Sequence, residues 1–164
     1  MQVFEFDTVV IGSGLAGLTS ALYASQYGKV AIITKSGLDI SNSYNAQGGI
    51  AAAIGDNDTI KSHMDDSMIA GRGLCDKDAM QVLVNEGRKC VSDLIKMKMP
   101  FDKIDGKFTL GLEGGHSKRR ILHEEGDATG KVLTRFMLER ILNNNNISAY
   151  ENTTVVDLII NDNV

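Results

Sequence analysis

Six residues near the amino terminus have the types and spacing of a phosphate-binding loop. Gly12-Ser13-Gly14-Leu15-Ala16-Gly17 follows the β-branched run Asp7-Thr8-Val9-Val10-Ile11 and precedes an apolar pattern of helical spacing. In such a strand–loop–helix, the first glycine permits a tight turn, the second lets the backbone approach a pyrophosphate, and the third lets the helix pack closely on the sheet. The free N–H groups and the dipole of the helix favour the negative charge of phosphates. The motif therefore predicts a dinucleotide-binding site.

The residues after the second predicted strand differ from the usual pattern of nicotinamide-binding domains. That pattern places Asp or Glu at the end of the strand, where the carboxylate binds the ribose hydroxyls. This chain has Thr34-Lys35-Ser36 at the corresponding place. A lysine there could pair with a phosphate, or backbone groups could hold the ribose instead. An NAD(P)-binding domain is therefore kept only as an alternative.

The hydrophobic pattern predicts an α/β fold. A buried parallel strand over residues 3–11, a helix over 15–27 and a strand over 30–34 form a βαβ unit with a right-handed crossover. The polar, glycine-containing residues 36–57 predict an ordered binding loop. The other predicted elements are helices over 59–70 and 128–142, a helix that Asp76 caps and that ends before Pro100, a hairpin over 101–110 with Asp105-Gly106 at its turn, a glycine-rich loop over 111–117, and strands over 147–150 and 154–160.

Composition and charge restrict the partners of the chain. The net charge is −4 and the only basic cluster is Lys118-Arg119-Arg120, which argues against nucleic acid, since binding to the phosphate backbone needs a basic face. No apolar run is long enough to cross a bilayer and the first residues are unlike a signal peptide, so the protein is predicted to be cytoplasmic. Cys75 and Cys90 have no CxxC spacing and are predicted to be reduced thiols.

The histidines and arginines leave several interpretations open. No two of the three histidines have the spacing of metal ligands, so no metal site is predicted. His63 is predicted to lie on a helix surface. Arg119 and Arg120 could bind a substrate carboxylate or form a structural salt bridge.

Several segments together resemble a known family. Gly12 to Gly17, Thr34-Lys35 and Asn45-Ala46-Gln47-Gly48-Gly49-Ile50 are similar to the succinate dehydrogenase and fumarate reductase flavoprotein family. Leu112-Glu113-Gly114-Gly115-His116-Ser117-Lys118-Arg119-Arg120-Ile121-Leu122-His123 and Asp127-Ala128-Thr129-Gly130 resemble its L-aspartate oxidase branch. The resemblance covers nearly the whole chain. It implies that residues 1–164 are the N-terminal part of a Rossmann-like FAD-binding domain with a central parallel sheet, incomplete because the capping and C-terminal parts are absent.

The same resemblance implies FAD as a non-covalent cofactor. Respiratory fumarate reductases carry a histidine at the position of Asn42 and attach FAD through it, whereas asparagine cannot form that link. Residues expected at the pyrophosphate are Gly12, Ser13, Gly14, Leu15, Ala16 and Gly17. Residues expected around the adenosine diphosphate and the isoalloxazine are Lys35, Asn42, Ser43, Tyr44, Asn45, Ala46, Gln47, Gly48 and Gly49, with Thr154 and Val155 at the adenine end.

Glu113 and His116 are the residues expected to contact the substrate. In the resembled branch, the glutamate that matches Glu113 lies near the substrate amino group, and a carboxylate complements an ammonium that succinate lacks. The implied reaction is the oxidation of L-aspartate to iminoaspartate in quinolinate and NAD biosynthesis, with oxygen or fumarate as electron acceptor. The catalytic residues of the family lie in later parts of its members. None is therefore predicted here, and the fragment alone is expected to be inactive.

Two other functions remain as alternatives: a fumarate reductase or succinate dehydrogenase flavoprotein subunit, and a non-catalytic nucleotide-binding module. A sheet without all its strands would also have open edges. Because unpaired edge strands invite pairing with another chain, a dimer through these edges is a further expectation.

Overall fold

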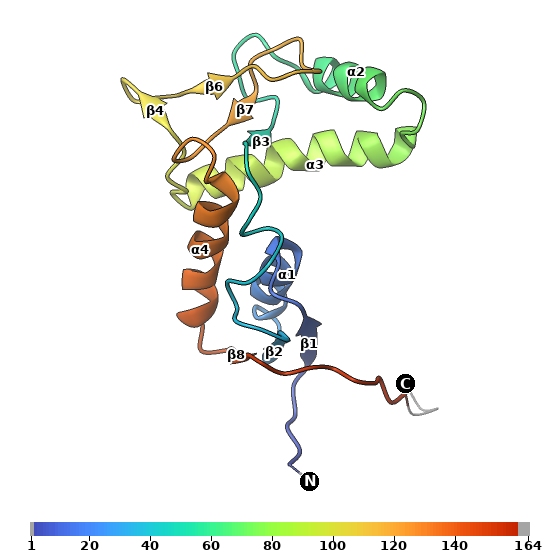
Figure 1. The fold of residues 1–164 in the computed structure, drawn as a ribbon, viewed down its shortest axis with the longest axis vertical. Coiled ribbons are helices and arrows are strands. Elements are labelled where there is room, and N and C mark those ends of the chain that lie inside the picture. The colour runs from blue at the N-terminus through green and yellow to red at the C-terminus, as the bar shows by residue number, and fades with distance from the viewer. Residues whose placement is uncertain (1, 161–164) are drawn as a thin grey trace. The chain divides into compact units, whose positions relative to one another are not determined.

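The computed structural model describes residues 2–160, which divide into two compact units (Figure 1). Unit 1 contains residues 2–46 and 130–160, and unit 2 contains residues 47–129. The chain thus leaves unit 1 after the predicted phosphate loop and returns to it for the last helix and strand. Each unit has its own sheet and is described separately.

A three-stranded parallel sheet lies at the centre of unit 1. Its strands are β1 (Thr8–Ile11), β2 (Val30–Ile33) and β8 (Ile147–Tyr150), in the order β1-β2-β8. The register pairs the last residues of the three strands, Ile11 with Ile33 and Ile33 with Tyr150. All three carboxyl ends therefore meet at one edge of the sheet, which is where open α/β sheets bind their ligands.

Helices α1 (Leu15–Ala24) and α4 (Thr129–Leu142) precede β2 and β8. The buried apolar core of unit 1 comes mainly from α1, β2 and α4. Its residues there are Leu18, Ala21, Val30, Ala31, Ile32, Leu133, Met137, Leu138 and Ile141. The turn before β8 is tied to the end of α1, because the Asn144 and Asn146 side-chain amides donate to the Ser25 hydroxyl and carbonyl oxygens, each at 2.9 Å. These bonds account for the asparagine-rich turn at residues 143–146.

Two predicted strands of unit 1 differ from those observed. The first is shorter than predicted, and it is not buried, since Val9 and Ile11 are 52% and 57% exposed. The strand predicted over 154–160 does not form in the described part of the chain. Parallel strands need a neighbour to satisfy their N–H and C=O groups, and no described strand pairs with this segment. In the three-stranded order, β1 and β8 are edge strands, and association through them stays a prediction.

Unit 2 combines two helices with small antiparallel sheets. The strands β3 (Ile50–Ala51), β7 (Ile121–Leu122) and β6 (Leu110–Gly111) pair in the order β3-β7-β6, and β4 (Lys103–Ile104) pairs with β5 (Lys107–Phe108). The turn of this second pair is Asp105-Gly106, with φ of +50° and +77°, which are the left-handed angles of a type I′ hairpin. The predicted hairpin is confirmed.

Each helix of unit 2 begins after a capping residue, and the prediction that Asp76 is such a cap is confirmed. They are α2 (Ile60–Ala70) and α3 (Lys77–Lys96). The Thr59 hydroxyl accepts from Ser62 N at 3.0 Å, and the Asp76 carboxylate accepts from Ala79 N at 2.8 Å. Each side chain satisfies an N–H group that has no partner within its helix.

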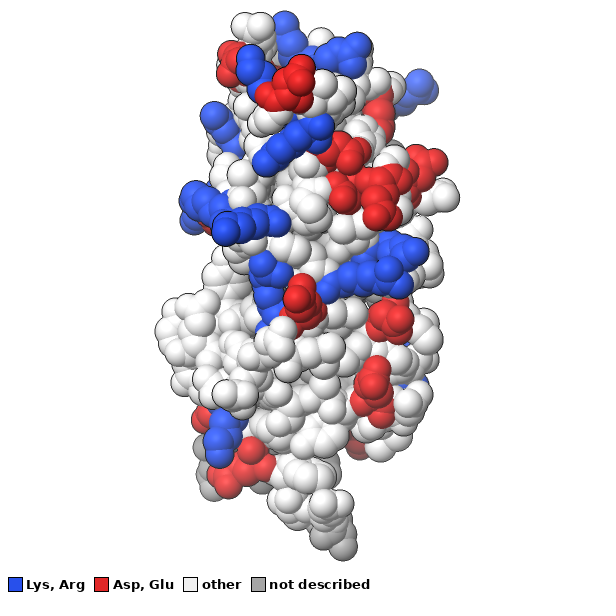
Figure 2. Space-filling model, turned by 90° about the vertical axis from the view of Figure 1, so that its left-hand side faces the viewer, with Lys and Arg blue, Asp and Glu red and all other residues white. Residues whose placement is uncertain are grey.

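The surface carries charges of both signs. On the face drawn in Figure 2, lysine and arginine side chains lie next to aspartate and glutamate side chains. Within residues 2–160, no helix has the length and apolar character needed to span a bilayer. Cys75 and Cys90 are both free thiols, and Cys90 is exposed.

The close approach of α1 to the phosphate loop yields a stability prediction. A Cβ at Gly17 would overlap the carbonyl oxygen of Gly12, so we expect Gly17→Ala to destabilise the chain by about 2 kcal/mol or more. Gly87→Ala is the matched control, because Gly87 lies in α3 with open space where the new methyl group would stand, and this change should stabilise by about 0.5–1 kcal/mol. Urea unfolding of both variants checks this. Equal stabilities would contradict the packing argument.

Candidate functional site

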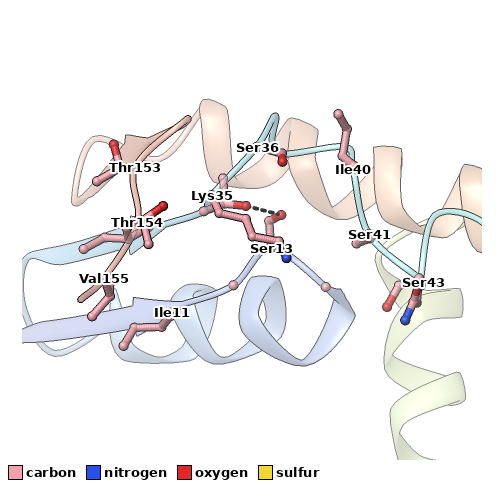
Figure 3. A pocket seen from close by; sticks show the side chains of 15 residues that line it. Ile11, Ser13, Lys35, Ser36, Ile40, Ser41, Ser43, Thr153, Thr154 and Val155 are labelled. Atoms are coloured by element: carbon pink, nitrogen blue, oxygen red, sulfur yellow. Dashed lines mark hydrogen bonds between the residues drawn. The ribbon is translucent and has the colours of Figure 1, made fainter. Parts of the chain in front are cut away.

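A pocket of about 490 Å³ lies in unit 1 at the carboxyl ends of its strands. This volume falls within the range of small-molecule sites. Figure 3 shows Thr153, Thr154 and Val155 at one end of the pocket and Ser41 and Ser43 at the other. The full lining is Ile11, Gly12, Ser13, Gly14, Ile33, Thr34, Lys35, Ser36, Ile40, Ser41, Asn42, Ser43, Thr153, Thr154 and Val155.

The predicted phosphate loop forms one wall of this pocket. Gly12 has a φ of +103°, a conformation that only glycine adopts readily, and its N–H donates to the Ile33 carbonyl at 2.8 Å. Gly14 is the N-cap of α1 and contributes no capping side chain, and the first turn of the helix has no acidic residue. The helix therefore begins with N–H groups and a positive dipole end at the pocket, without a carboxylate to compete for them.

Two serines define the space at the start of α1. Ser43 Oγ accepts from Leu15 N at 3.1 Å, so one first-turn amide is bonded to this hydroxyl. A Cβ at Gly14 would lie 3.3 Å from the same oxygen, so a side chain there would require Ser43 to shift. Ser13 is buried and its hydroxyl donates to Thr34 Oγ1 at 3.3 Å, which links the phosphate loop to the end of β2.

Backbone and side-chain bonds hold the segments after β2 and β8 together. Thr153 N donates to the Thr34 carbonyl at 3.0 Å, and Asn152 N donates to the Ser36 carbonyl at 3.2 Å. The Glu151 carboxylate accepts from Leu38 N at 2.7 Å. The two segments thus continue side by side beyond the sheet and form the rest of the pocket. Figure 3 shows the Lys35 side chain extending over the pocket toward Ser13.

The predicted cofactor residues separate into three groups. Those that line the pocket are Gly12, Ser13, Gly14, Lys35, Asn42, Ser43, Thr154 and Val155. Leu15, Ala16 and Gly17 continue into α1, and Tyr44, Asn45 and Ala46 follow the lining residues within unit 1. Gln47, Gly48 and Gly49 belong to unit 2. Whether each residue contacts the cofactor stays a prediction.

Other lining residues were not among those predicted: Ile11, Ile33, Thr34, Ser36, Ile40, Ser41 and Thr153. The positions directly after β1 and β2 could have been found, because parallel strands present their carboxyl ends to ligands. Thr153 is adjacent to the predicted Thr154, and its backbone bond to Thr34 follows from the pairing of β2 with the distant β8.

The predicted substrate residues lie in unit 2, in the glycine-rich loop between β6 and β7. Glu113 Oε1 lies 3.0 Å from His123 Nε2, and the Glu113 side chain is half exposed. The His116 ring lies 5.6 Å from the His63 ring, and His116 Nδ1 lies 3.5 Å from Arg120 Nη1. Both predicted residues are therefore held by neighbours of the same unit.

A buried arginine anchors this loop. Arg120 is fully buried and donates two hydrogen bonds to Asp58, at 2.8 and 2.9 Å, and it lies 3.0 Å from Asp66. Asp66 in turn accepts from both the N–H and the hydroxyl of Ser117, each at 2.8 Å. Of the two roles considered for Arg120, the structural salt bridge is the one observed.

His63 is buried in α2, so the prediction that it lies on a helix surface is wrong. Its Nδ1 has no hydrogen-bond partner among the described residues. Burial lowers the pKa of His63, and electrostatic interactions with Arg120 and His116 lower it further, while those with Asp58 and Asp66 act in the opposite direction. The pKa of Asp66 is also lowered, chiefly by the hydrogen bond from Ser117 N. His63 is therefore neutral and Asp66 charged at neutral pH.

Comparison with known proteins decides the family. Residues 7–164 match the family described as FAD binding domain. This chain belongs to that family. Its cofactor is FAD, and the observed parallel sheet with a glycine loop opening α1 is the Rossmann-like fold predicted for it. The start of α1, with a glycine N-cap and no carboxylate in its first turn, fits a diphosphate group.

Relatives of known sequence and structure extend the comparison. The chain is 44% identical to the L-aspartate oxidase of Streptomyces coelicolor over 93% of its length, and 40% identical to that of Vibrio cholerae over 98%. It spans only 27% and 31% of those two proteins. Its fold matches a quinol fumarate reductase of E. coli with a TM-score of 0.90 at 28% identity, and the Mycobacterium smegmatis Sdh1 complex with 0.87 at 30%. It covers 28% and 29% of those chains.

The lowered pKa of His63 predicts a pH dependence of stability. Because the pKa in the folded state lies below the ordinary value of 6.5, the unfolded chain binds this proton more readily. Stability should therefore be full above pH 6.5 and fall as the pH decreases from there, by at most about 1.4 kcal/mol per pH unit. His63→Phe should remove this slope between pH 6.5 and 5.5 in urea unfolding. An unchanged slope would contradict the assignment to His63.

Proposed function

We propose that this chain is the FAD-binding part of an L-aspartate oxidase, which converts L-aspartate to iminoaspartate. The observation that carries the choice of branch is its 44% identity to such an oxidase over 93% of the chain. The pocket at the carboxyl ends of the unit 1 strands supports FAD binding by residues of this chain. Because the chain spans about a quarter to a third of these relatives, turnover is proposed for the complete protein only.

Unit 1 would hold the cofactor through its backbone. The amides at the start of α1 and the helix dipole would bind the diphosphate, with the Lys35 ammonium adding positive charge at the same pocket. Ile11 and Val155 give the pocket an apolar wall that suits an adenine ring. Bound FAD supplies the two-electron oxidation of the substrate.

Asn42 supports non-covalent attachment. It lines the pocket, and its side-chain amide nitrogen is a poor nucleophile toward the flavin methyl group. Non-covalent attachment of FAD is proposed for the complete protein.

Glu113 would complement the substrate ammonium. Its carboxylate is half exposed in a loop that is anchored by Asp66 and Arg120, so it is both accessible and held in place. A negative group at this site favours an amino dicarboxylate over a dicarboxylate without an ammonium. L-aspartate is therefore the proposed substrate, oxygen or fumarate the proposed acceptor, and NAD biosynthesis the proposed pathway.

A fumarate reductase or succinate dehydrogenase subunit is the second candidate. The structural match to the E. coli quinol fumarate reductase, with a TM-score of 0.90, favours it. The higher identity to the oxidases and the asparagine at position 42 favour the first candidate.

The two candidate functions differ in which compound, L-aspartate or succinate, should reduce the flavin. In the complete protein under anaerobic conditions, we expect L-aspartate to bleach the flavin absorbance and succinate to leave it unchanged. The isolated chain should show no turnover with either. Bleaching by succinate alone would overturn the proposal in favour of the second candidate.

The phosphate loop predicts a loss of FAD binding in Gly14→Val. The new side chain would meet Ser43 and occupy the space of the diphosphate, so we expect FAD affinity to fall about 10-fold or more. Titration of FAD fluorescence with the chain measures this, and Gly87→Ala on α3 should bind like the unsubstituted chain. Equal affinities of Gly14→Val and the control would argue against diphosphate binding at this loop.

Non-covalent attachment predicts where the flavin is found after denaturation. When the complete protein is precipitated with acid, we expect the flavin to appear in the supernatant, measured by its absorbance. Flavin retained in the washed precipitate would show a covalent link and contradict the assignment to Asn42.

A further inference from the structure

His123 lies in a slot that two glycines of unit 2 create. It follows β7 directly, and the register of the sheet places it opposite Gly49, before β3, while Gly111 of β6 pairs with Ile121, two residues before His123. A Cβ at Gly111 would lie 2.6 Å from His123 Cε1, and one at Gly49 would lie 3.0 Å from His123 Cδ2. Neither glycine has a positive φ. Gly111 therefore leaves space for the imidazole ring rather than permitting an unusual backbone. At Gly49 a Cβ would first meet Ile121 Cγ2 and the Leu122 carbonyl oxygen, and the ring only after them.

The ring held in this slot is bonded to Glu113. His123 Nε2 lies 3.0 Å from Glu113 Oε1, and with the proton on Nε2 the histidine donates and leaves the carboxylate its negative charge. The His123 side chain is three-quarters buried, whereas that of Glu113 is half exposed. Within residues 2–160, the other carboxylate oxygen of Glu113 has no hydrogen bond. One oxygen is thus fixed by the protein and one is open to a ligand.

The backbone that carries Glu113 is fixed at both ends of its loop. Arg120 N donates to the Gly111 carbonyl at 3.1 Å and closes the base of the loop. The two bonds from Ser117 to Asp66 attach its far side to α2. With the backbone held in this way, the remaining freedom of Glu113 is that of its side chain, and His123 removes much of it.

We propose that His123 is a positioning residue that orients the Glu113 carboxylate toward the ammonium of an amino dicarboxylate substrate. A preoriented carboxylate loses less side-chain entropy when it pairs with the ammonium, so it binds that group more tightly. A dicarboxylate without an ammonium gains nothing from this orientation. His123 therefore contributes to substrate choice. The inference rests on the proposed function, since it takes Glu113 as the partner of the substrate ammonium.

The test uses the complete protein, three single variants, one double variant and one control variant. His123→Leu removes the donor, and His123→Gln keeps an amide donor of similar reach. Glu113→Gln provides the background for a double-mutant cycle, and Glu86→Gln on the exposed surface of α3 is the control. The readouts are kcat and KM for L-aspartate and the Kd of succinate, measured by the change in flavin absorbance. Flavin content and the unfolding temperature verify that each variant is folded.

We expect His123→Leu to raise the KM for L-aspartate about 5- to 10-fold, with kcat within about two-fold of the unsubstituted value and succinate affinity unchanged. His123→Gln should recover most of the loss. In the Glu113→Gln background, His123→Leu should have no further effect, because the two residues act through one contact.

Each other outcome overturns the inference. An unchanged KM in His123→Leu shows that the contact does not matter for the substrate. An equal loss of L-aspartate and succinate affinity, or additive effects in the cycle, shows a general structural role instead. If His123→Leu does not fold, His123→Gln is compared with Glu113→Gln instead. A KM for L-aspartate that rises as much in His123→Gln as in Glu113→Gln would show that the glutamine does not replace the histidine, and would overturn the inference. Failure of the proposed function is distinct, because the unsubstituted protein would then not oxidise L-aspartate at all.

Discussion

The approach of the first helix to the end of the first strand is the constraint on which unit 1 depends. Gly12 turns the chain with a positive φ, and the absence of a side chain at Gly17 lets α1 begin directly against the Gly12 carbonyl. The same geometry leaves the first N–H groups of α1 facing a pocket bordered by the ends of β1 and β2. A methyl group at position 17 would push α1 away from the Gly12 carbonyl and move its first N–H groups relative to the pocket. The contacts that stabilise unit 1 are therefore the same ones that place the N–H groups for cofactor binding.

Unit 2 is organised around a buried ionic network rather than a glycine turn. Arg120 is completely buried, and its partners Asp58 and Asp66 neutralise it. Burial of such a group is costly unless every donor is satisfied, and removal of one partner leaves an unpaired charge. The ionic network connects α2 to the loop that carries Glu113 and His116, and it thereby fixes the position of that loop.

Local features were predictable from the sequence, and distant pairings were not. These local features are the phosphate loop, the cap Asp76 and the Asp105-Gly106 turn. Each depends on residues only a few positions apart, where backbone preferences decide the structure. The burial of His63 could not be predicted, since it arises from packing beside His116, far away in the sequence. The segment 154–160 has the β-branched composition of a strand, but composition does not supply a pairing partner.

The central claim is that backbone amides at the opening of α1 bind the diphosphate of FAD. The most direct measurement is the change in backbone ¹H–¹⁵N NMR signals of the chain when FAD is added. We expect the largest changes at the amides of residues 12–17, with further changes at Lys35 and Ser43. FAD binding that leaves the signals of residues 12–17 unchanged would contradict the claim.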